Sequence, residues 1–383
     1  MKILYCAIDQ AVPGTHGGSV HVTAVAEGLA GLGHEVHALV TPGGPWPSDR
    51  VDWIAMRPPL GARQLRWART GRVRAIAERI RPDVILERYY NFGGEGIAVA
   101  ASVGAIGVLE VNAPVIDYPG SAKARLDRLL LLEPMRRWRD RICRLSTLIV
   151  TPSAAILPPS TPPSRIVEVE WGADTERFRP GVSGDLPFTR QAGTLAVFAG
   201  AFRSWHGAIH LVHAIGDLRE RGRRDISAVF IGDGPELARV RAAAAGLDGV
   251  AFTGAIAHQR MPACLAAADV GVAPFDLAQH APLALGFYWS PLKIFEYMAS
   301  GLPVVAPRVG RIPALVEHDR EGWLYDPSVP RALAAALERT AEADTRQRLG
   351  KAARARAVRE YSWRAHCEKL EAAMHRALTN PRP

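Results

Sequence analysis

The segment 290–306 carries the residue pattern that most directly suggests chemistry. Lys293 and Glu296 lie three residues apart and therefore share one face of a predicted helix that starts near Pro291. A carboxylate there can accept two hydrogen bonds from a ribose diol, and a lysine can neutralise phosphate charge. Ser290 is expected to cap the helix N-terminus. A surface Lys–Glu pair would show the same spacing, but this helix leads into an apolar strand.

Two turns between a predicted strand and a predicted helix could hold an anion. Gly17 and Gly18 lie in the first turn, where glycine lets the backbone approach a ligand and the helix N-terminus favours negative charge. Arg203 and His206 lie in the second turn and place positive charge beside a helix N-terminus. The first turn lacks the GxGxxG spacing, so a nicotinamide dinucleotide is disfavoured. A tight structural turn and a solvent-facing arginine are the simpler alternatives.

Polar residues also follow the strands of the first half. Glu110 and Asn112 end one predicted strand, Arg88 and Tyr89 end the strand before it, and Asp117 lies in the following loop. A partly buried Glu110 could assist an acceptor hydroxyl as a general base. It could equally be a structural carboxylate whose oxygens are all hydrogen-bonded.

The elements that position these residues alternate between short apolar runs and amphipathic helices, in both halves of the chain. Such repeats predict an α/β fold with two Rossmann-like, doubly wound parallel sheets. We expect an N-terminal domain at 1–178, an irregular linker, and a C-terminal domain at 193–361. Ligands of such sheets bind at the carboxyl ends of the strands, so two domains facing each other would form a cleft.

The order of the motifs resembles the retaining glycosyltransferases of the GT-B fold, in the large group 1 or family four that includes sucrose synthase and bacterial mannosyl- and glucosaminyltransferases. Four matching segments carry the resemblance: Gly17-Gly18, the turn 231–235, the strand end 252–254, and the block 296–305. The resemblance covers nearly the whole chain. It implies an acceptor-binding N-terminal domain, a nucleotide-sugar-binding C-terminal domain, and a closing helix at about 362–383 that packs back on the N-terminal domain.

The family's roles transfer to individual residues of this chain. Glu296 matches the glutamate that binds the donor ribose, and Ser290, Leu292 and Lys293 match the loop around the diphosphate. The remaining donor-side matches are Gly17, Gly18, Arg203, His206 and Gly254. By the same resemblance, Glu110, Asn112 and Arg203 are candidate catalytic residues, and Arg88, Tyr89 and Asp117 lie on the acceptor side.

The chain departs from the family pattern at three places. Arg203 is displaced by two positions from the family's arginine on the diphosphate, and His206 replaces the family's lysine. Tyr288 stands where members commonly carry the first of two glutamates, which leaves recognition of the transferred sugar open. Glu110 and Asn112 stand where the family often places a histidine that faces the donor sugar.

The activity implied is transfer of a sugar from a nucleoside diphosphate sugar, UDP first and GDP second, to an acceptor hydroxyl with retention. No DxD pattern is present, so we expect no metal and no cofactor, since the nucleotide-sugar is a substrate. The product could be a cell-envelope glycan, a glycolipid or a natural-product glycoside. A sugar-nucleotide epimerase on the same fold and a non-catalytic donor-binding homologue are the alternatives; the acceptor and oligomeric state stay open.

Composition limits the classes of partner and the cellular compartment that we expect for this protein. The net charge of +9 suits an anionic substrate or surface, but the chain shows no nucleic-acid-binding motif, so nucleic acid is not expected. Four widely spaced cysteines and no long apolar stretch predict a cytoplasmic protein. The arginine-rich segments 61–81 and 121–145 predict basic amphipathic helices, and hence peripheral contact with an anionic membrane, unless they are ordinary solvated helices.

Overall fold

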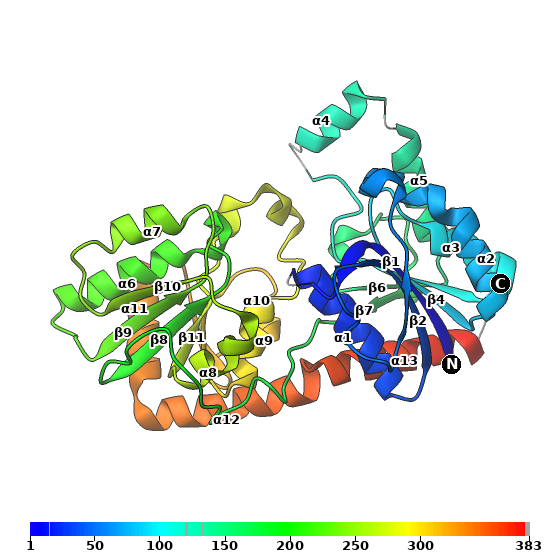
Figure 1. Cartoon of the computed structure of the whole chain (residues 1–383). Coiled ribbons are helices and arrows are strands. Elements are labelled where there is room, and N and C mark those ends of the chain that lie inside the picture. The colour runs from blue at the N-terminus through cyan, green and yellow to red at the C-terminus, as the bar shows by residue number, and fades with distance from the viewer. Residues whose placement is uncertain (15, 119–121, 132, 380–383) are drawn as a thin grey trace. The chain divides into compact units, whose positions relative to one another are not determined.

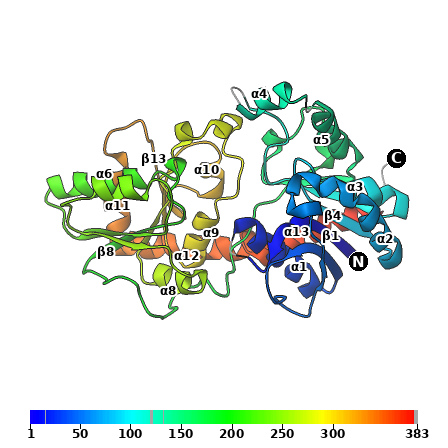
Figure 2. The ribbon, with the colours of Figure 1, turned by 45° about the horizontal axis from the view of Figure 1, so that its top comes forward.

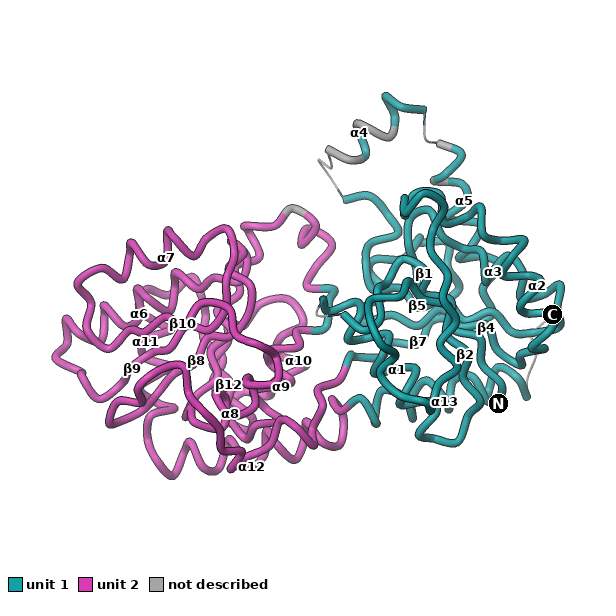
Figure 3. The backbone as a smooth tube through the Cα atoms, viewed as in Figure 1, with its two compact units in different colours: residues 1–171, 288–290, 363–383 teal, residues 172–287, 291–362 magenta. Residues whose placement is uncertain are grey.

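The computed structural model describes residues 1–14, 16–118, 122–131 and 133–379. The chain divides into two compact units (Figure 3). Unit 1 comprises residues 1–171, 288–290 and 363–383, and unit 2 comprises residues 172–287 and 291–362. Each unit contains one parallel sheet, as the alternating sequence pattern predicts.

Unit 1 is built on a seven-stranded sheet whose order is β3-β2-β1-β4-β5-β6-β7 (Figure 1). Its strands are β1 Lys2–Val12, β2 Glu35–Pro42, β3 Asp52–Ala55, β4 Val84–Arg88, β5 Ile106–Glu110, β6 Leu148–Thr151 and β7 Ile166–Glu168. Every pairing is parallel, and the apolar side chains of β1 are buried on both faces of the sheet. The strand order reverses at β1, which places the predicted ligand edge at the carboxyl ends of β1, β4 and β5.

Helices cover both faces of this sheet (Figure 2). The helices of unit 1 are α1 Gly17–Gly31, α2 Thr70–Ile80, α3 Glu95–Ala100, α4 Ala122–Leu129, α5 Glu133–Leu145 and α13 Trp363–Thr379. On one face, Val22 and Val25 of α1 share a core with Leu370 and Met374 of α13. On the other face, α2 and α3 cover the opposite side chains of the same strands. The closing helix therefore belongs to the core of unit 1.

The two arginine-rich segments differ from the expected continuous helices. Residues 61–81 form a 3₁₀ helix, Arg63–Arg69, followed by α2, and residues 121–145 form the separate helices α4 and α5. Residues 121 and 132 lie outside the described part of the chain. Arg66 and Arg139, which the pattern assigns to basic surfaces, are buried. Arg66 turns inward because three carboxylates lie beneath it, so the first segment is not a uniformly basic face.

Unit 2 contains a six-stranded parallel sheet in the order β10-β9-β8-β11-β12-β13. Its strands are β8 Thr194–Ala199, β9 Ile226–Ile231, β10 Val250–Gly254, β11 Val270–Val272, β12 Val304–Pro307 and β13 Gly322–Tyr325. Its helices are α6 Ala208–Glu220, α7 Leu237–Ala243, α8 Met261–Ala266, α9 Leu292–Ala299, α10 Ile312–Leu315, α11 Ala332–Ala341 and α12 Ala343–Glu360. The order reverses at β8, so its carboxyl end, at Gly200, is the expected ligand edge.

The predicted cellular compartment depends on the cysteines and on the apolar character of the helices. The four cysteines are free and buried, as their wide spacing suggests. Among the described residues, none of the helices combines the length and the apolar character that crossing a bilayer requires.

Candidate functional site

Lys293 is the most unusual side chain at the carboxyl edge of the unit 2 sheet. It lies in the first turn of α9, and its Nζ is buried without a hydrogen-bond partner among the described residues. The ammonium lies 4.2 Å from the ring centre of Phe198 and 5.2 Å from that of Phe275. Burial lowers the pKa of Lys293 to about 7, although Glu296 acts in the opposite direction. An anion in contact with Nζ would satisfy both its charge and its hydrogen-bonding capacity.

Glu296 lies one turn further along α9, as the spacing predicts. Its side chain is 19% exposed, and its Oε1 lies 3.4 Å from Nε2 of His258. The His258 ring rests against Phe178, with 5.6 Å between ring centres. Glu296 therefore combines an oriented carboxylate with access to solvent, which ribose binding requires.

The Arg203 and His206 pair carries less positive charge than the sequence predicts. Nδ1 of His206 contacts the Ala201 carbonyl oxygen, and burial, followed by the charge of Lys293, lowers the pKa of His206 to about 3. His206 is thus neutral at pH 7, which corrects its predicted role as a fixed cation. Arg203 lies over the Trp205 ring at 5.9 Å. Of this pair, only Arg203 can supply charge to a diphosphate.

The glycine turn 231–235 holds the strand ends of unit 2 close together. Gly232 has a φ of 132°, and a Cβ there would lie 2.0 Å from the Gly200 carbonyl oxygen. Only glycine fits this crossing. The Gly232 amide also donates to the carbonyl of Gly254, 2.9 Å away. The open space beside Gly254, where a Cβ would meet no atom within 4 Å, is compatible with the backbone approach predicted there.

Glu110 organises the corresponding edge of unit 1. It is 2% exposed, and it accepts hydrogen bonds from Tyr5 Oη at 2.6 Å and from Asn112 Nδ2 at 2.5 Å. Arg88 Nη1 lies 3.4 Å away, and His21 Nε2 contacts Oε1, although burial lowers the pKa of His21. Burial alone would raise the pKa of Glu110, but these partners outweigh it and hold the pKa well below its usual range. This geometry favours a positioning role for Glu110 over proton transfer.

His21 is the residue of this cluster that sequence reasoning missed. It lies on the buried face of α1, where its ring centre is 4.4 Å from that of Trp171 and 5.2 Å from that of Trp363. A lone histidine among apolar helix positions gives no signal of its own. Its only cue was its place one turn after the Gly17-Gly18 motif.

The predicted acceptor-side residues separate into two groups. Arg88 stays with Glu110 and lies over the Trp171 ring at 5.8 Å, and Asn112 Oδ1 accepts from Trp171 Nε1 at 2.7 Å. Tyr89 instead points into the protein, where burial raises its pKa and its hydroxyl donates to Asn91 at 2.9 Å. Asp117 is half-buried in the loop after β5, and its charge acts on Tyr89.

The glycine motif of α1 lies against the same cluster. A Cβ at Gly18 would lie 2.2 Å from Gln10 Oε1 and 3.4 Å from Arg88 Nη2. A Cβ at Gly17 would lie 3.8 Å from Trp171. Gly17, Gly18, Arg88, Glu110 and Asn112 are therefore assembled at one edge of unit 1.

Ser290 does not cap α9. The helix begins at Leu292, its N-cap is Pro291, and no side chain caps it. The Ser290 hydroxyl instead donates to Glu170 Oε2 at 2.7 Å and accepts from the Trp171 amide at 2.9 Å. Residues 288–290 belong to unit 1. Because the Ser290 hydroxyl is already hydrogen-bonded there, it is not free to cap α9 or to donate to a diphosphate, as predicted. Tyr288 is 8% exposed, and burial raises its pKa to about 12.

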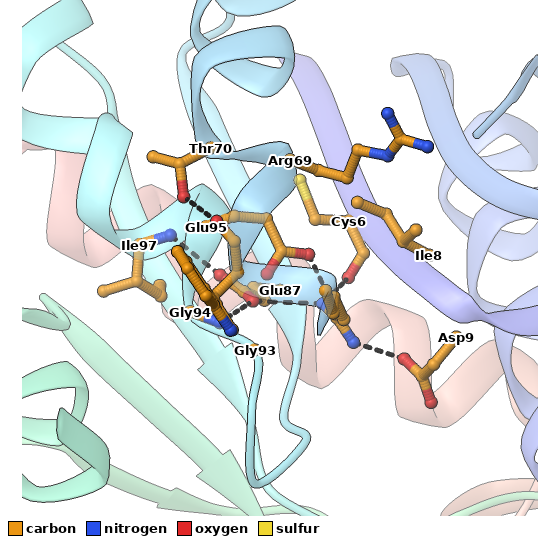
Figure 4. Close-up of polar contacts among 12 residues, drawn as sticks. Cys6, Ile8, Asp9, Arg69, Thr70, Glu87, Gly93, Gly94, Glu95 and Ile97 are labelled. Carbon is orange, nitrogen blue, oxygen red and sulfur yellow. Dashed lines mark hydrogen bonds and ion pairs between the residues drawn. The ribbon is translucent and has the colours of Figure 1, made fainter. Parts of the chain in front are cut away.

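A buried ionic network also lies in unit 1, and no sequence pattern predicted it. Arg66 is fully buried and contacts Asp9, Glu87 and Glu95 (Figure 4). Glu87 also accepts the amides of Gly94 at 2.6 Å and Ile97 at 2.8 Å, at the start of α3. One guanidinium therefore joins β1, β4 and α3, and fixes the strand ends that carry Asp9 and Arg88.

Two family models match this chain. The model described as glycosyl transferases group 1 matches residues 193–343, and the model described as glycosyltransferase family 4 matches residues 15–158. The chain belongs to this family, and its two α/β units have the GT-B fold.

Named relatives agree with this assignment. Sulfoquinovosyl transferase SQD2 of Arabidopsis thaliana is 27% identical over 78% of this chain and 58% of its own length. A GDP-mannose-dependent alpha-(1-6)-phosphatidylinositol monomannoside mannosyltransferase of Mycobacterium tuberculosis is 28% identical over 52% of this chain and 53% of its own. The chain thus spans between half and three fifths of these relatives.

A solved structure supports the fold alone. The crystal structure of Anabaena HepE in complex with UDP superposes with a TM-score of 0.68 at 17% identity, covering 98% of this chain and 100% of the other.

Proposed function

We propose that this protein is a glycosyltransferase that moves a sugar from a nucleoside diphosphate sugar to an acceptor hydroxyl. The observation that carries the proposal is the buried Lys293 ammonium, which has no hydrogen-bond partner in the part of the chain that the structure describes. The partly exposed Glu296 carboxylate lies one turn further along the same helix. A nucleoside diphosphate presents phosphate oxygens to the first group and a ribose diol to the second. The family assignment and the position of Lys293 beside Phe198 and Gly200 at the end of β8, where the strand order reverses, support the same activity.

The chemical demand of this reaction is stabilisation of the departing diphosphate. Lys293 and Arg203 supply positive charge, and the desolvated surroundings of Nζ strengthen its attraction for phosphate. We propose that these groups need no metal and no cofactor. Retention of the anomeric configuration is proposed from the family resemblance.

On the acceptor side, we propose that Arg88 and Asn112 contact the sugar or the acceptor. Both side chains are oriented by hydrogen bonds to Glu110, and Asn112 is also held by a hydrogen bond from Trp171. Glu110 then acts by positioning these groups.

We propose UDP as the first candidate base and GDP as the second. The structural neighbour HepE was crystallised with UDP, whereas the mycobacterial relative is named for GDP-mannose. A thermal-shift panel of UDP, GDP, ADP and dTDP on wild type and Glu296→Ala tests the site and the base together. We expect one diphosphate to raise the wild-type midpoint, because it binds only the folded state.

Loss of that shift in Glu296→Ala would place the nucleotide at α9. If no diphosphate shifts the wild-type midpoint, the proposed donor site is wrong. If a diphosphate binds but no screened sugar donor is hydrolysed, transferred or epimerised, the non-catalytic alternative replaces the transferase. Conversion of the donor to its epimer would select the epimerase.

We further propose that α4 and α5 contact an anionic membrane. Leu129, Leu130 and Leu131 are 79%, 57% and 80% exposed. Contiguous exposed apolar side chains of this kind often mark an interaction surface. Exposed arginines flank them at positions 125, 128, 137, 141 and 144. Apolar insertion beside basic side chains is the pattern of an interfacial segment.

Leu131→Asp tests this surface in vesicle co-sedimentation. We expect the wild-type protein to bind vesicles that contain phosphatidylglycerol, and to bind them more weakly at high salt. It should not bind vesicles of neutral phosphatidylcholine. Leu131→Asp should weaken binding at least tenfold, while Val358→Asp, a matched change at a 45% exposed residue of unit 2, should not. Equal binding to neutral vesicles, or equal loss in both variants, contradicts the proposal.

A further inference from the structure

A group of metal-binding side chain types lies at the edge of unit 1 opposite to Glu110. His34 lies in the turn between α1 and β2, and Glu371 and His375 lie on α13. One ligand atom from each residue lies within 4.8 Å of the other two. Glu371 and His375 are four residues apart, so the helix itself brings them to one face.

The contact between His34 and Glu371 is not an ordinary hydrogen bond. Nε2 of His34 lies 2.9 Å from Glu371 Oε1, yet the two atoms lack hydrogen-bond alignment, and Nε2 has no other partner among the residues that the structure describes. The His34 side chain is 6% exposed, so water does not easily replace that partner. Two ligand atoms that each lie about 2.0–2.2 Å from one tetrahedral zinc ion are themselves separated by about 3.4 Å, slightly more than the 2.9 Å between Nε2 of His34 and Oε1 of Glu371.

We propose that His34, Glu371 and His375 bind one divalent transition-metal ion, with zinc as the first candidate. Two imidazoles and one carboxylate suit Zn²⁺ better than Mg²⁺ or Ca²⁺, which prefer oxygen ligands. The half-buried Glu371 and the exposed His375 leave room for a water as fourth ligand.

The surroundings of His34 hold its ring in place for this role. Nδ1 lies 3.2 Å from the amine nitrogen of Met1, on the side of the ring away from Glu371. This contact leaves Nε2 as the ring nitrogen that faces Glu371 and the proposed metal.

The site would fasten the last turns of α13 to the amino end of the sheet. Met1 and Glu35 lie at that end, whereas Glu110 lies at the carboxyl end, so the metal has no part in sugar transfer. Its role is structural, because a metal that binds only the folded chain adds its binding free energy to folding.

Zinc titration of protein stripped with a chelator, and carrying no histidine tag, tests the site. We expect one Zn²⁺ per chain by calorimetry, a raised melting midpoint, and a visible absorption band of low symmetry when Co²⁺ is used. His375→Ala and Glu371→Gln should each weaken Zn²⁺ binding at least tenfold. Both residues lie outside the buried core, so these variants should fold.

His213→Ala, which removes an exposed histidine of α6 in unit 2, is the matched control and should bind as wild type does. The proposal is overturned if wild type and His375→Ala bind zinc with equal affinity. It is also overturned if His213→Ala loses as much, because binding is then adventitious at surface histidines.

Discussion

At the scale of single residues, the charge state of Lys293 makes nucleotide binding depend on pH. Burial lowers its pKa from an ordinary value near 10.5 to about 7, so the free protein holds this lysine largely neutral above pH 7. A bound diphosphate favours the charged form, so binding takes up a proton in that range. We expect the affinity for the diphosphate to fall by up to about tenfold per pH unit above pH 7.

Calorimetry in two buffers of different ionisation enthalpy measures this uptake at pH 8. Lys293→Arg keeps a fixed cation and should remove the proton uptake while retaining part of the binding. Lys293→Met should remove both. An uptake that persists unchanged in both variants would assign the proton to another group, such as the phosphate itself.

Residue-level prediction from sequence succeeded where spacing along one element decides the outcome. Lys293 and Glu296 share a helix face, as their three-residue separation requires. Ser290 failed as a cap because its hydroxyl is used by Glu170 and Trp171, far away in sequence. His21 was missed for the same reason, since only the fold brings it to Glu110.

At the scale of elements, the Arg66 network should make the stability of unit 1 depend on pH. Burial raises the pKa of Glu95 to about 8, against the attraction of Arg66, from an ordinary value near 4.5. The folded state therefore binds this proton more tightly than the unfolded state. Stability from this group is present below about pH 4.5, declines as the pH rises to about 8, and is constant beyond.

Glu95→Gln should flatten that decline, because the amide is neutral at every pH and can still accept from Arg66 Nε. Glu95 alone contributes at most about 1.4 kcal/mol per pH unit to the wild-type slope in this window. Denaturant unfolding at pH 5 and pH 8 measures the difference between the two proteins. Glu78→Gln, an exposed change on α2, is the control and should keep the wild-type slope. Parallel slopes for Glu95→Gln and wild type would show that Glu95 is ionised in the folded protein.

Helices and strands, too, were predicted correctly where the pattern within one element decides the outcome. Apolar runs predicted the central strands of both sheets, because a strand buried on two faces must be apolar throughout. The short edge strands β3 and β7, with mixed burial, gave no such run and were missed. The arginine-rich segment 61–81 failed as one helix because Arg66 is held by carboxylates from three other elements.

At the scale of the whole molecule, each unit has its own core, although unit 1 takes its last helix from the end of the chain. The family comparison supports the two sheets, but the inward packing of α13 depends on contacts between residues more than 300 positions apart, such as Cys367 with Val25. Separate cores predict separate stabilities, so an equilibrium unfolding curve need not be two-state.

Leu370→Ala tests whether the last helix stabilises unit 1 alone. Leu370 is 1% exposed in the core shared by α1 and α13, so truncation should cost about 2–5 kcal/mol. Hydrogen exchange should then accelerate in β1 and α1, while β8 and β9 keep their wild-type protection. Leu218→Ala, a fully buried change in α6 of unit 2, should reverse the pattern. If Leu370→Ala accelerates exchange equally in both sheets, the two cores unfold as one cooperative unit. A ligand bound at Lys293 in unit 2 would then stabilise the Glu110 cluster of unit 1 as strongly as it stabilises unit 2.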